Sequence, residues 1–196
     1  MVIIAFIITA AAVAVDQASK LYIKNSMELG ESFSFIPGVL NIRYIENPGA
    51  SFGILADHRW VFMSFSAVAL AFMFAAIFYM NKRELSRYNR LPSVALALMF
   101  GGGIGNMIDR FFNVSEDPRR EGVNVVVDFL ELDFVDFAIF NFADVFITAG
   151  SLLFCACIFL GKYKIGAAEE RELIYEDGCG GISGEAVQDG DGRPAD

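Results

Sequence analysis

The chain contains one stretch that decides its fold class, Val61-Phe-Met-Ser-Phe-Ser-Ala-Val-Ala-Leu-Ala-Phe-Met-Phe-Ala-Ala-Ile-Phe-Tyr-Met80. This run has no charged side chain, and a helix needs about 20 apolar residues to cross the hydrocarbon core of a bilayer. The whole sequence agrees, because 55% of its 196 residues are hydrophobic and its mean hydropathy is +0.48. That composition is too apolar for an ordinary soluble domain, so the sequence predicts an integral membrane protein.

Three further apolar runs reach a spanning length, at about residues 2–23, 91–109 and 139–161. With 61–80 they predict four transmembrane helices in a domain over residues 1–162, joined on one side by loops 24–59 and 111–138. The first run also permits another reading, because small residues over 9–15 are typical of the end of a cleavable signal peptide. The basic segment that begins such a peptide is missing, which favours a retained helix.

The short connection 81–90 predicts the orientation in the membrane. It carries four basic residues against one acid, and basic loops favour the cytoplasmic side. Four spans then place both termini in the cytoplasm and the two longer loops outside. Nine of the 24 acidic residues lie in the last 35 positions, so the net charge of -9 mainly describes a tail. We expect this tail, residues 163–196, to be disordered.

The first outer loop contains a hairpin pattern. Residues 32–44 alternate aromatic and β-branched side chains with polar ones, and Pro37-Gly38 lies in the middle. Such alternation around a turn dipeptide predicts two antiparallel strands. The predicted fold class is therefore an all-α membrane protein with four transmembrane helices and a small outer-surface β-hairpin or sheet.

Three acidic residues fall within the predicted spans: Asp16, Asp109 and Asp144. A charged carboxylate in hydrocarbon is costly, so such residues usually face a partner or a cavity and indicate function. Asp16 and Lys20 are four positions apart on one helix face, where they can pair with each other or with the bundle interior. Asn141 precedes Asp144 by three positions and shares its face.

The third span ends in a glycine-rich segment followed by polar residues, Gly101-Gly-Gly-Ile-Gly-Asn-Met-Ile-Asp-Arg110. Small residues let helices approach closely, so packing is the commoner role of such a run. It is not a phosphate loop, because no strand precedes it and no Gly-Lys-Ser/Thr follows it. Asn106 and Arg110 share a face and are able to hold a substrate backbone or a carboxylate. Asp109 is expected to pair with the adjacent Arg110.

Two polar groups lie in the outer loops. The segment 47–53 predicts a turn that exposes the Asn47 amide. Asp128 lies within the apolar segment 125–130, where burial would raise the pKa of its carboxyl. The 16 positions between Asp128 and Asp144 allow the loop to fold back and bring both acids together.

Several site types are excluded by residue counts. His58 is the one histidine, so a zinc site or di-iron centre built on several histidines is excluded. Cys155 and Cys157 lie in an apolar run and Cys179 lies in the polar tail, so no pairing is implied.

Taken in order, five segments resemble the signature of the lipoprotein signal peptidases, also called signal peptidase II. They are Asp16-Gln-Ala-Ser-Lys20, Asn47-Pro-Gly-Ala-Ser-Phe52, Gly105-Asn-Met-Ile-Asp-Arg110, Val126-Val-Asp-Phe129 and Phe140-Asn-Phe-Ala-Asp144. The resemblance covers roughly residues 1–162. It implies an aspartic endopeptidase that removes signal peptides from diacylglyceryl-modified prolipoproteins, with Asp128 and Asp144 as the catalytic pair.

The resemblance also assigns supporting residues. Positions that match the family's substrate-binding or supporting residues are Asn47, Gly49, Asn106, Arg110, Asn141 and Ala143, whereas Asp16, Lys20 and Asp109 match structural polar positions. It implies neither a metal nor another cofactor, nor nucleic acid. The expected partners are the prolipoprotein substrate and membrane lipid. The enzyme is expected to act as a monomer in the bacterial cytoplasmic (inner) membrane, with its active site toward the outer face.

Two features depart from the family pattern. The segment 111–127 is longer than the family usually has, which could alter access to the site, and the acidic tail is unusual. The chemistry of the pair still follows from its residues, since two close carboxylates share a proton at neutral pH. One acts as a base toward water and the other as an acid toward the scissile carbonyl. Because such acids titrate together, the sequence leaves open which aspartate plays which part.

Two alternatives use the same acids. A proton- or ion-coupled transporter would place polar groups near the midplane of several spans, whereas here they crowd the outer ends. A magnesium enzyme acting on lipid phosphates would use Asp109, Asp128 and Asp144 as oxygen ligands. It would need metal for activity and clustered basic residues at its site.

Overall fold

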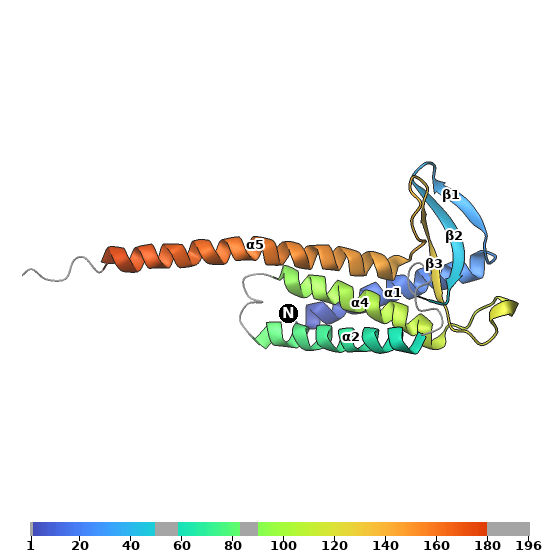
Figure 1. Cartoon of the computed structure of the whole chain (residues 1–196), viewed down its shortest axis with the longest axis horizontal. Coiled ribbons are helices and arrows are strands. Elements are labelled where there is room, and N and C mark those ends of the chain that lie inside the picture. Colours follow the sequence, from blue (N-terminus) through green and yellow to red (C-terminus); the bar gives the residue numbers. More distant parts are fainter. Residues whose placement is uncertain (1, 50–58, 83–89, 180–196) are drawn as a thin grey trace, which may run out of the picture. The chain divides into compact units, whose positions relative to one another are not determined.

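The computed structural model describes residues 2–49, 59–82 and 90–179. Its elements, in order, are α1 (Val2–Ser26), β1 (Ser32–Ile36), β2 (Leu40–Asn47), α2 (Arg59–Lys82), α4 (Leu91–Phe112), the 3₁₀ helix η3 (Pro118–Arg120), β3 (Val126–Leu132) and α5 (Phe142–Cys179) (Figure 1). The chain forms two compact units, Met1–Cys157 and Ile158–Asp196. All the predicted site residues belong to the first unit.

The helices have the lengths that a bilayer requires. Among the described residues, three are long and apolar enough to cross a membrane, Val2–Ser26, Leu91–Phe112 and Phe142–Leu160, and α2 contains a shorter apolar run, Met63–Tyr79. In each of the three longer apolar helices the charged residues gather near one end. Four helices with a small sheet confirm the predicted fold class of a helical membrane protein.

Small residues of α4 allow close helix packing, as the glycine-rich pattern predicts. A Cβ atom added at Gly101 would lie 2.8 Å from the Ala12 Cβ of α1, and one at Gly102 would collide with the Ala143 carbonyl oxygen of α5. Gly150 of α5 has equally little room against the Ala95 carbonyl, at 2.7 Å. The glycines therefore bring the α4 backbone against both neighbours, which fixes the polar residues that follow.

The sheet is antiparallel with strand order β1-β2-β3 and lies at one end of α1 and α4 (Figure 1). The predicted hairpin is present, and Gly38 takes the positive φ of +75° that its turn requires. The third strand was not predicted, because the segment around Asp128 has no turn partner nearby in sequence. Its Val127 and Phe129 pack with Ile23 of α1 and Tyr44 of β2.

A β-bulge lies in the middle of β2. Ile42 pairs with Leu130, but the next pair is Ile45 with Asp128, so two residues of β2 oppose Phe129 alone. A bulge shifts which side chains reach each face of a sheet. Here it places Ile45 and Asn47, instead of their neighbours, on the face that carries Asp128.

The start of α5 differs from the predicted span. Phe140 exchanges backbone hydrogen bonds with Leu130, at 2.8 and 3.1 Å, which forms an isolated bridge to β3, and the helix begins only at Phe142. Asp144 consequently lies in the first helical turn and not five residues into a span.

The far end of α5 also differs, because the helix continues to Cys179 where disorder is predicted from residue 163. Residues 167–173, Ala-Ala-Glu-Glu-Arg-Glu-Leu, are strong helix formers. The remaining tail, 180–196, and residues 83–89 of the basic connection lie outside the described residues.

Candidate active site

Asp128 lies in the middle of the buried strand β3, with 3% of its surface exposed. Both carboxylate oxygens accept hydrogen bonds from side-chain amides. Asn47 Nδ2 of β2 donates to Oδ2 at 3.0 Å, and Asn141 Nδ2 donates to Oδ1 at 2.6 Å. The strand pairing therefore aims Asp128 at the junction of the sheet with α5.

Asp144 lies in the first turn of α5, where it forms a reciprocal cap with Asn141. The Asp144 N–H donates to Asn141 Oδ1 at 3.1 Å, and the Asn141 N–H donates to Asp144 Oδ2 at 3.2 Å. A carboxylate in this position is stabilised by the free N–H groups and dipole of the helix start. Asn106 Nδ2 of α4 donates to the other oxygen at 2.8 Å.

Asn141 joins the two acids, which we call the aspartate pair (Asp128 and Asp144). Its side chain is fully buried, its amide nitrogen binds Asp128, and its carbonyl oxygen and backbone N–H hold Asp144. The same amide nitrogen donates to Asn106 Oδ1 at 3.1 Å. The structure thus brings together the residues that the sequence spacing of 16 positions allows to meet.

The surroundings of Asp128 favour its protonated form. Burial raises the pKa of this carboxyl to about 7, and the negative charge of Asp144 adds to the rise. Hydrogen bonds from Asn47 and Asn141 and the positive charge of Lys20 lower the pKa but do not cancel the effect of burial. As the apolar neighbours predict, the carboxyl carries its proton close to neutral pH.

A second buried group lies beside the pair, the ion cluster (Asp16, Lys20 and Asp109). Lys20 Nζ lies 2.8 Å from Asp16 Oδ2 and 3.1 Å from Asp109 Oδ2, and all three side chains are at most 5% exposed. Lys20 also donates to Asn106 Oδ1 at 3.0 Å. Asn106 therefore connects the ion cluster to Asp144.

Asp109 has more partners than the sequence predicts. The charge of Asp109 acts on the adjacent Arg110. Its carboxylate also binds Lys20 and accepts hydrogen bonds from Gln17 Nε2 and Val127 N, at 3.1 and 3.2 Å. Gln17 was missed by the sequence analysis, although it lies inside the segment that begins with Asp16.

The ion cluster ties four elements together. Asp16 Oδ1 of α1 accepts the Ala143 N–H of α5 at 2.9 Å, and Asp109 of α4 accepts the Val127 N–H of β3. Ala143 thus contributes through its backbone. These contacts fix the start of α5 and the middle of β3, which carry the aspartate pair.

Arg110 and Gly49 lie on the other side of the pair. Arg110 donates to the Asn106 carbonyl at 3.0 Å and to the Gly49 carbonyl at 3.5 Å, and its charge acts on both Asp128 and Asp144. The Gly49 N–H donates to Asn47 Oδ1 at 3.0 Å. This leaves the Asn47 amide nitrogen directed at Asp128. Residues 50–52 of the same segment lie outside the described residues.

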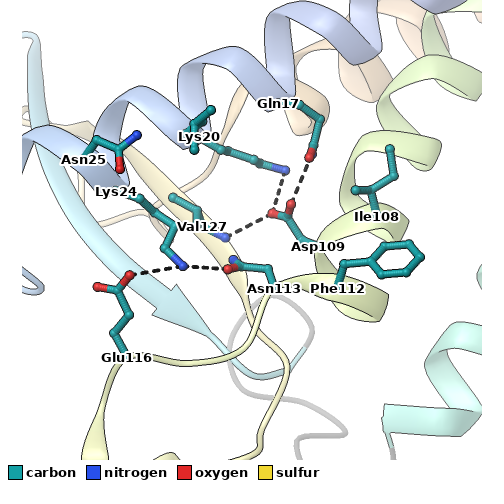
Figure 2. Close-up of a pocket in the computed structure, with 11 residues that line it drawn as sticks. Gln17, Lys20, Lys24, Asn25, Ile108, Asp109, Phe112, Asn113, Glu116 and Val127 are labelled. Carbon is teal, nitrogen blue, oxygen red and sulfur yellow. Dashed lines mark hydrogen bonds and ion pairs between the residues drawn. The ribbon is translucent and has the colours of Figure 1, made fainter.

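A cavity of about 270 Å³ lies between the ends of α1 and α4 (Figure 2). Lys20 and Asp109 reach it from opposite sides, and Figure 2 shows Gln17, Lys20 and the Val127 N–H converging on the Asp109 carboxylate. The described residues that line it belong to the side of the ion cluster and not to the aspartate pair.

The fold and the site together define a polytopic helical membrane protein with a two-carboxylate centre at one end of its helices. The sequence profile of signal peptidase II matches residues 8–160. Lipoprotein signal peptidases of Streptococcus pyogenes serotypes M6 and M1 are 39% identical over 146 residues, which are 74% of this chain and 86% of each relative. The chain therefore belongs to the signal peptidase II family, and it is a peptidase.

Solved structures agree. Two structures described as a bacterial membrane enzyme, determined by the in meso method at 2.3 and 1.9 Å resolution, are 34% and 33% identical to the chain. The first superimposes with a TM-score of 0.63 over 81% of this chain and 87% of its own, and the second with 0.62 over 79% and 91%. The family favours a peptidase over the transporter and the magnesium enzyme considered above.

Proposed function

We propose that the chain is an aspartic endopeptidase that cleaves signal peptides from diacylglyceryl-modified prolipoproteins, with Asp128 and Asp144 as its catalytic pair. The observation that carries the proposal is that both carboxylates are held on one buried asparagine, Asn141. Curated relatives with 39% identity bear the name lipoprotein signal peptidase, which supports the substrate class.

The geometry supports a mechanism in which the pair shares one proton. Because the pKa of Asp128 is raised to about 7, one carboxyl of the pair is protonated and the other ionised at neutral pH. The ionised member takes a proton from water as the water attacks the scissile carbonyl. The protonated member donates a hydrogen bond to that carbonyl oxygen, and a proton then passes to the leaving amine.

The neighbouring residues hold the pair in place for this reaction. Asn47, Asn106 and Asn141 donate hydrogen bonds to the two carboxylates and fix their orientation. Arg110 adds positive charge near the carboxylates, where negative charge develops on the carbonyl oxygen. We assign the site to the outer face of the bacterial cytoplasmic membrane, both termini to the cytoplasm, and the active form to a monomer.

The test compares Asp128→Asn and Asp144→Asn with the parent, using a diacylglyceryl-modified prolipoprotein in detergent. Because a side-chain amide cannot act as a general acid or base near neutral pH, each variant should lose about 10²–10⁴-fold in kcat. Asp136→Asn is the control, since Asp136 is exposed, and its rate should equal that of the parent. Full activity of either pair variant, or inactivation of the parent by EDTA, would overturn the proposal.

A companion variant checks the choice of partner. Asp109→Asn keeps the shape of the ion cluster but weakens its contact with Lys20, so it should retain measurable cleavage. If this variant were inactive while Asp144→Asn cleaved normally, Asp109 would be the catalytic partner of Asp128.

The pH dependence follows from the raised pKa of Asp128. Below about pH 7 the Asp128 carboxyl holds its proton, and above it this carboxyl is ionised and the acid is lost. We therefore expect kcat/KM to fall about tenfold per pH unit well above pH 7, on an otherwise intact enzyme. A rate that stays constant up to pH 9 would contradict the shared proton.

A further inference from the structure

Glu46 is a buried carboxylate for which the mechanism has no use. It precedes Asn47 in β2, and 5% of its surface is exposed. Its oxygens accept hydrogen bonds from the Tyr44 hydroxyl at 3.3 Å, from the Glu116 N–H at 3.0 and 3.2 Å, and from the Ser115 hydroxyl. Because burying a carboxylate is costly without such donors, these contacts indicate a built arrangement.

The position of Glu46 in the sheet connects it to the active site. Glu46 pairs with Val127 and Asn47 pairs with Val126, so the two neighbours point to opposite faces of β2. Asn47 points to the face of Asp128 and donates to its Oδ2. Contacts that fix the Glu46 side chain therefore fix β2 from its opposite face. They do so one residue before Asn47, which binds Asp128.

Apart from Tyr44, the groups that hold Glu46 come from the segment 113–124, which lies within the lengthened part of the chain. β1 pairs with β2 up to Arg43, and the turn before β1 bonds to Tyr44. Within the described residues, the last part of β2 therefore has no strand on that side. The segment fills this place, because Arg120 Nη1 donates to the Glu46 carbonyl at 3.0 Å. It thereby satisfies the open edge of β2 without adding a strand.

The segment is itself anchored. Val114 and Asn124 form an antiparallel bridge that closes it, and the Ser115 N–H donates to the Val123 carbonyl at 2.8 Å. On the other side Lys24 of α1 lies 2.8 Å from Asn113 Oδ1 and 3.2 Å from the Glu116 carboxylate. Glu46 is thus held by a loop that is fixed to α1.

We propose that Glu46 is a positioning residue, which uses the 113–124 segment as a clamp on β2 and thereby directs Asn47 onto Asp128. The inference rests on the proposed role of Asp128. It assigns a role to the lengthened segment, whose sequence alone suggests only altered access. Glu46 acts through Asn47 and does not contact the substrate.

The role predicts a measurable change at Asp128. The Asn47 amide lowers the pKa of this carboxyl, so a strand that no longer aims Asn47 leaves the pKa higher. The other charges that act on Asp128 come from Asp144, Lys20 and Arg110, which belong to α5, α1 and α4 and not to β2. A variant of Glu46 should therefore move the alkaline limb of kcat/KM upward, which a purely structural loss would not do.

The experiment measures kcat/KM against pH for the full chain and four variants. Glu46→Ala removes the acceptor and should move the alkaline limb up by about half a unit while lowering kcat/KM about fivefold at pH 7, the size expected for one hydrogen bond. Glu46→Gln keeps one acceptor oxygen and the side-chain shape, and should lie between Glu46→Ala and the parent.

Two adjacent arginines supply a matched pair. Arg120→Ala removes the donor to the Glu46 carbonyl and should move the limb in the same direction as Glu46→Ala, by less. Arg119→Ala removes a side chain that is 88% exposed and pairs with Asp117 inside the segment, so its profile should equal that of the parent. The comparison of Arg120→Ala with Arg119→Ala tests the positioning role even if Glu46→Ala does not fold.

The outcomes separate this inference from the proposed function. If Asp128→Asn is inactive and the parent shows its limb near pH 7, but Glu46→Ala and Arg120→Ala keep that limb unmoved, the positioning role is wrong. Equal effects of Arg119→Ala and Arg120→Ala would overturn it as well. If Asp128→Asn cleaves normally, the proposed function itself has failed.

Discussion

Two pairs of aspartates, three of them buried, lie side by side in this molecule and differ in what neutralises them. In the ion cluster, Asp16 and Asp109 share one lysine, Lys20, at 2.8 and 3.1 Å. In the aspartate pair, Asp128 and Asp144 accept hydrogen bonds from asparagine amides. Side-chain amides stabilise a carboxylate less than a contacting cation does. In the aspartate pair a bound proton therefore supplies the neutralisation that Lys20 supplies in the ion cluster.

The difference shows how one kind of residue supports two roles. A carboxylate in contact with a buried lysine is suited to holding its partners, as Asp16 holds the Ala143 N–H and Asp109 holds the Val127 N–H. A carboxylate satisfied by amides keeps an exchangeable proton near neutral pH. The first pair is suited to fixing structure and the second to acid–base chemistry, although all four side chains are aspartates.

The largest loss of stability is expected from replacing Lys20, the cation of the ion cluster. Lys20→Met would leave Asp16 and Asp109 buried without a compensating charge, which costs about 3–5 kcal/mol of stability. Thermal unfolding in detergent measures the loss. Lys24→Met is the matched control one helical turn away, because Lys24 pairs with Glu116, which is 52% exposed, and such pairs contribute about 0–1 kcal/mol. Equal losses in the two variants would contradict the comparison.

The second prediction concerns how the stability of the fold depends on pH through Asp128. The carboxyl of Asp128 has a pKa of 3.8 when unfolded and of about 7 when folded, so between these values only the folded state binds the proton. Stability is highest below the lower pKa and falls as the pH rises through the higher one. Between pH 5 and pH 8 the parent should lose roughly 2.5 kcal/mol more than Asp128→Asn does.

Unfolding midpoints at the two pH values test this expectation. Asp136→Asn provides the control, since an exposed aspartate leaves the pH dependence of the parent in place. If the parent and Asp128→Asn lose stability in parallel, the proton does not reside on Asp128.

The smallest loss of stability is expected at the glycines of α4 that lie beside the ion cluster. A Cβ atom at Gly105 would collide with the Asp16 carboxylate, which cannot move without releasing Lys20. Gly105→Ala should therefore cost about 1–3 kcal/mol. At Gly103 the same atom would meet the end of the Leu70 side chain at 2.7 Å, which can turn aside, so Gly103→Ala should cost less. Unfolding midpoints that rank the two variants in the reverse order would disprove this account.

Local pattern was sufficient to predict the helices and the hairpin. Apolar runs of spanning length and the Pro37-Gly38 turn both act over neighbouring residues, and both predictions are confirmed. Strand β3 was missed because its partner β2 lies about 80 positions away in sequence. The start of α5 was misplaced for the same reason, since Phe140 is drawn into the sheet by Leu130.

The candidate site divides in the same way. Residue types and order were sufficient to select the acids and asparagines as candidates. Their pairing was not, because the sequence offered Asp109 only the adjacent Arg110, whereas packing of α1 against α4 adds Lys20 as a partner. The roles of Gln17 and Glu46 depend on contacts with residues far along the chain and have no local signal beyond their proximity to recognisable segments.

What the sequence by itself determined is the environment of the chain and the side chains available to it: apolar helices, carboxylates at their ends and amides nearby. What only the tertiary structure decided is which neighbour faces which. The bulge after Ile42 is the clearest case, because an uninterrupted register would turn Glu46, and not Asn47, toward Asp128. Alternation along a strand is local, but the register between strands is set by packing across the whole unit.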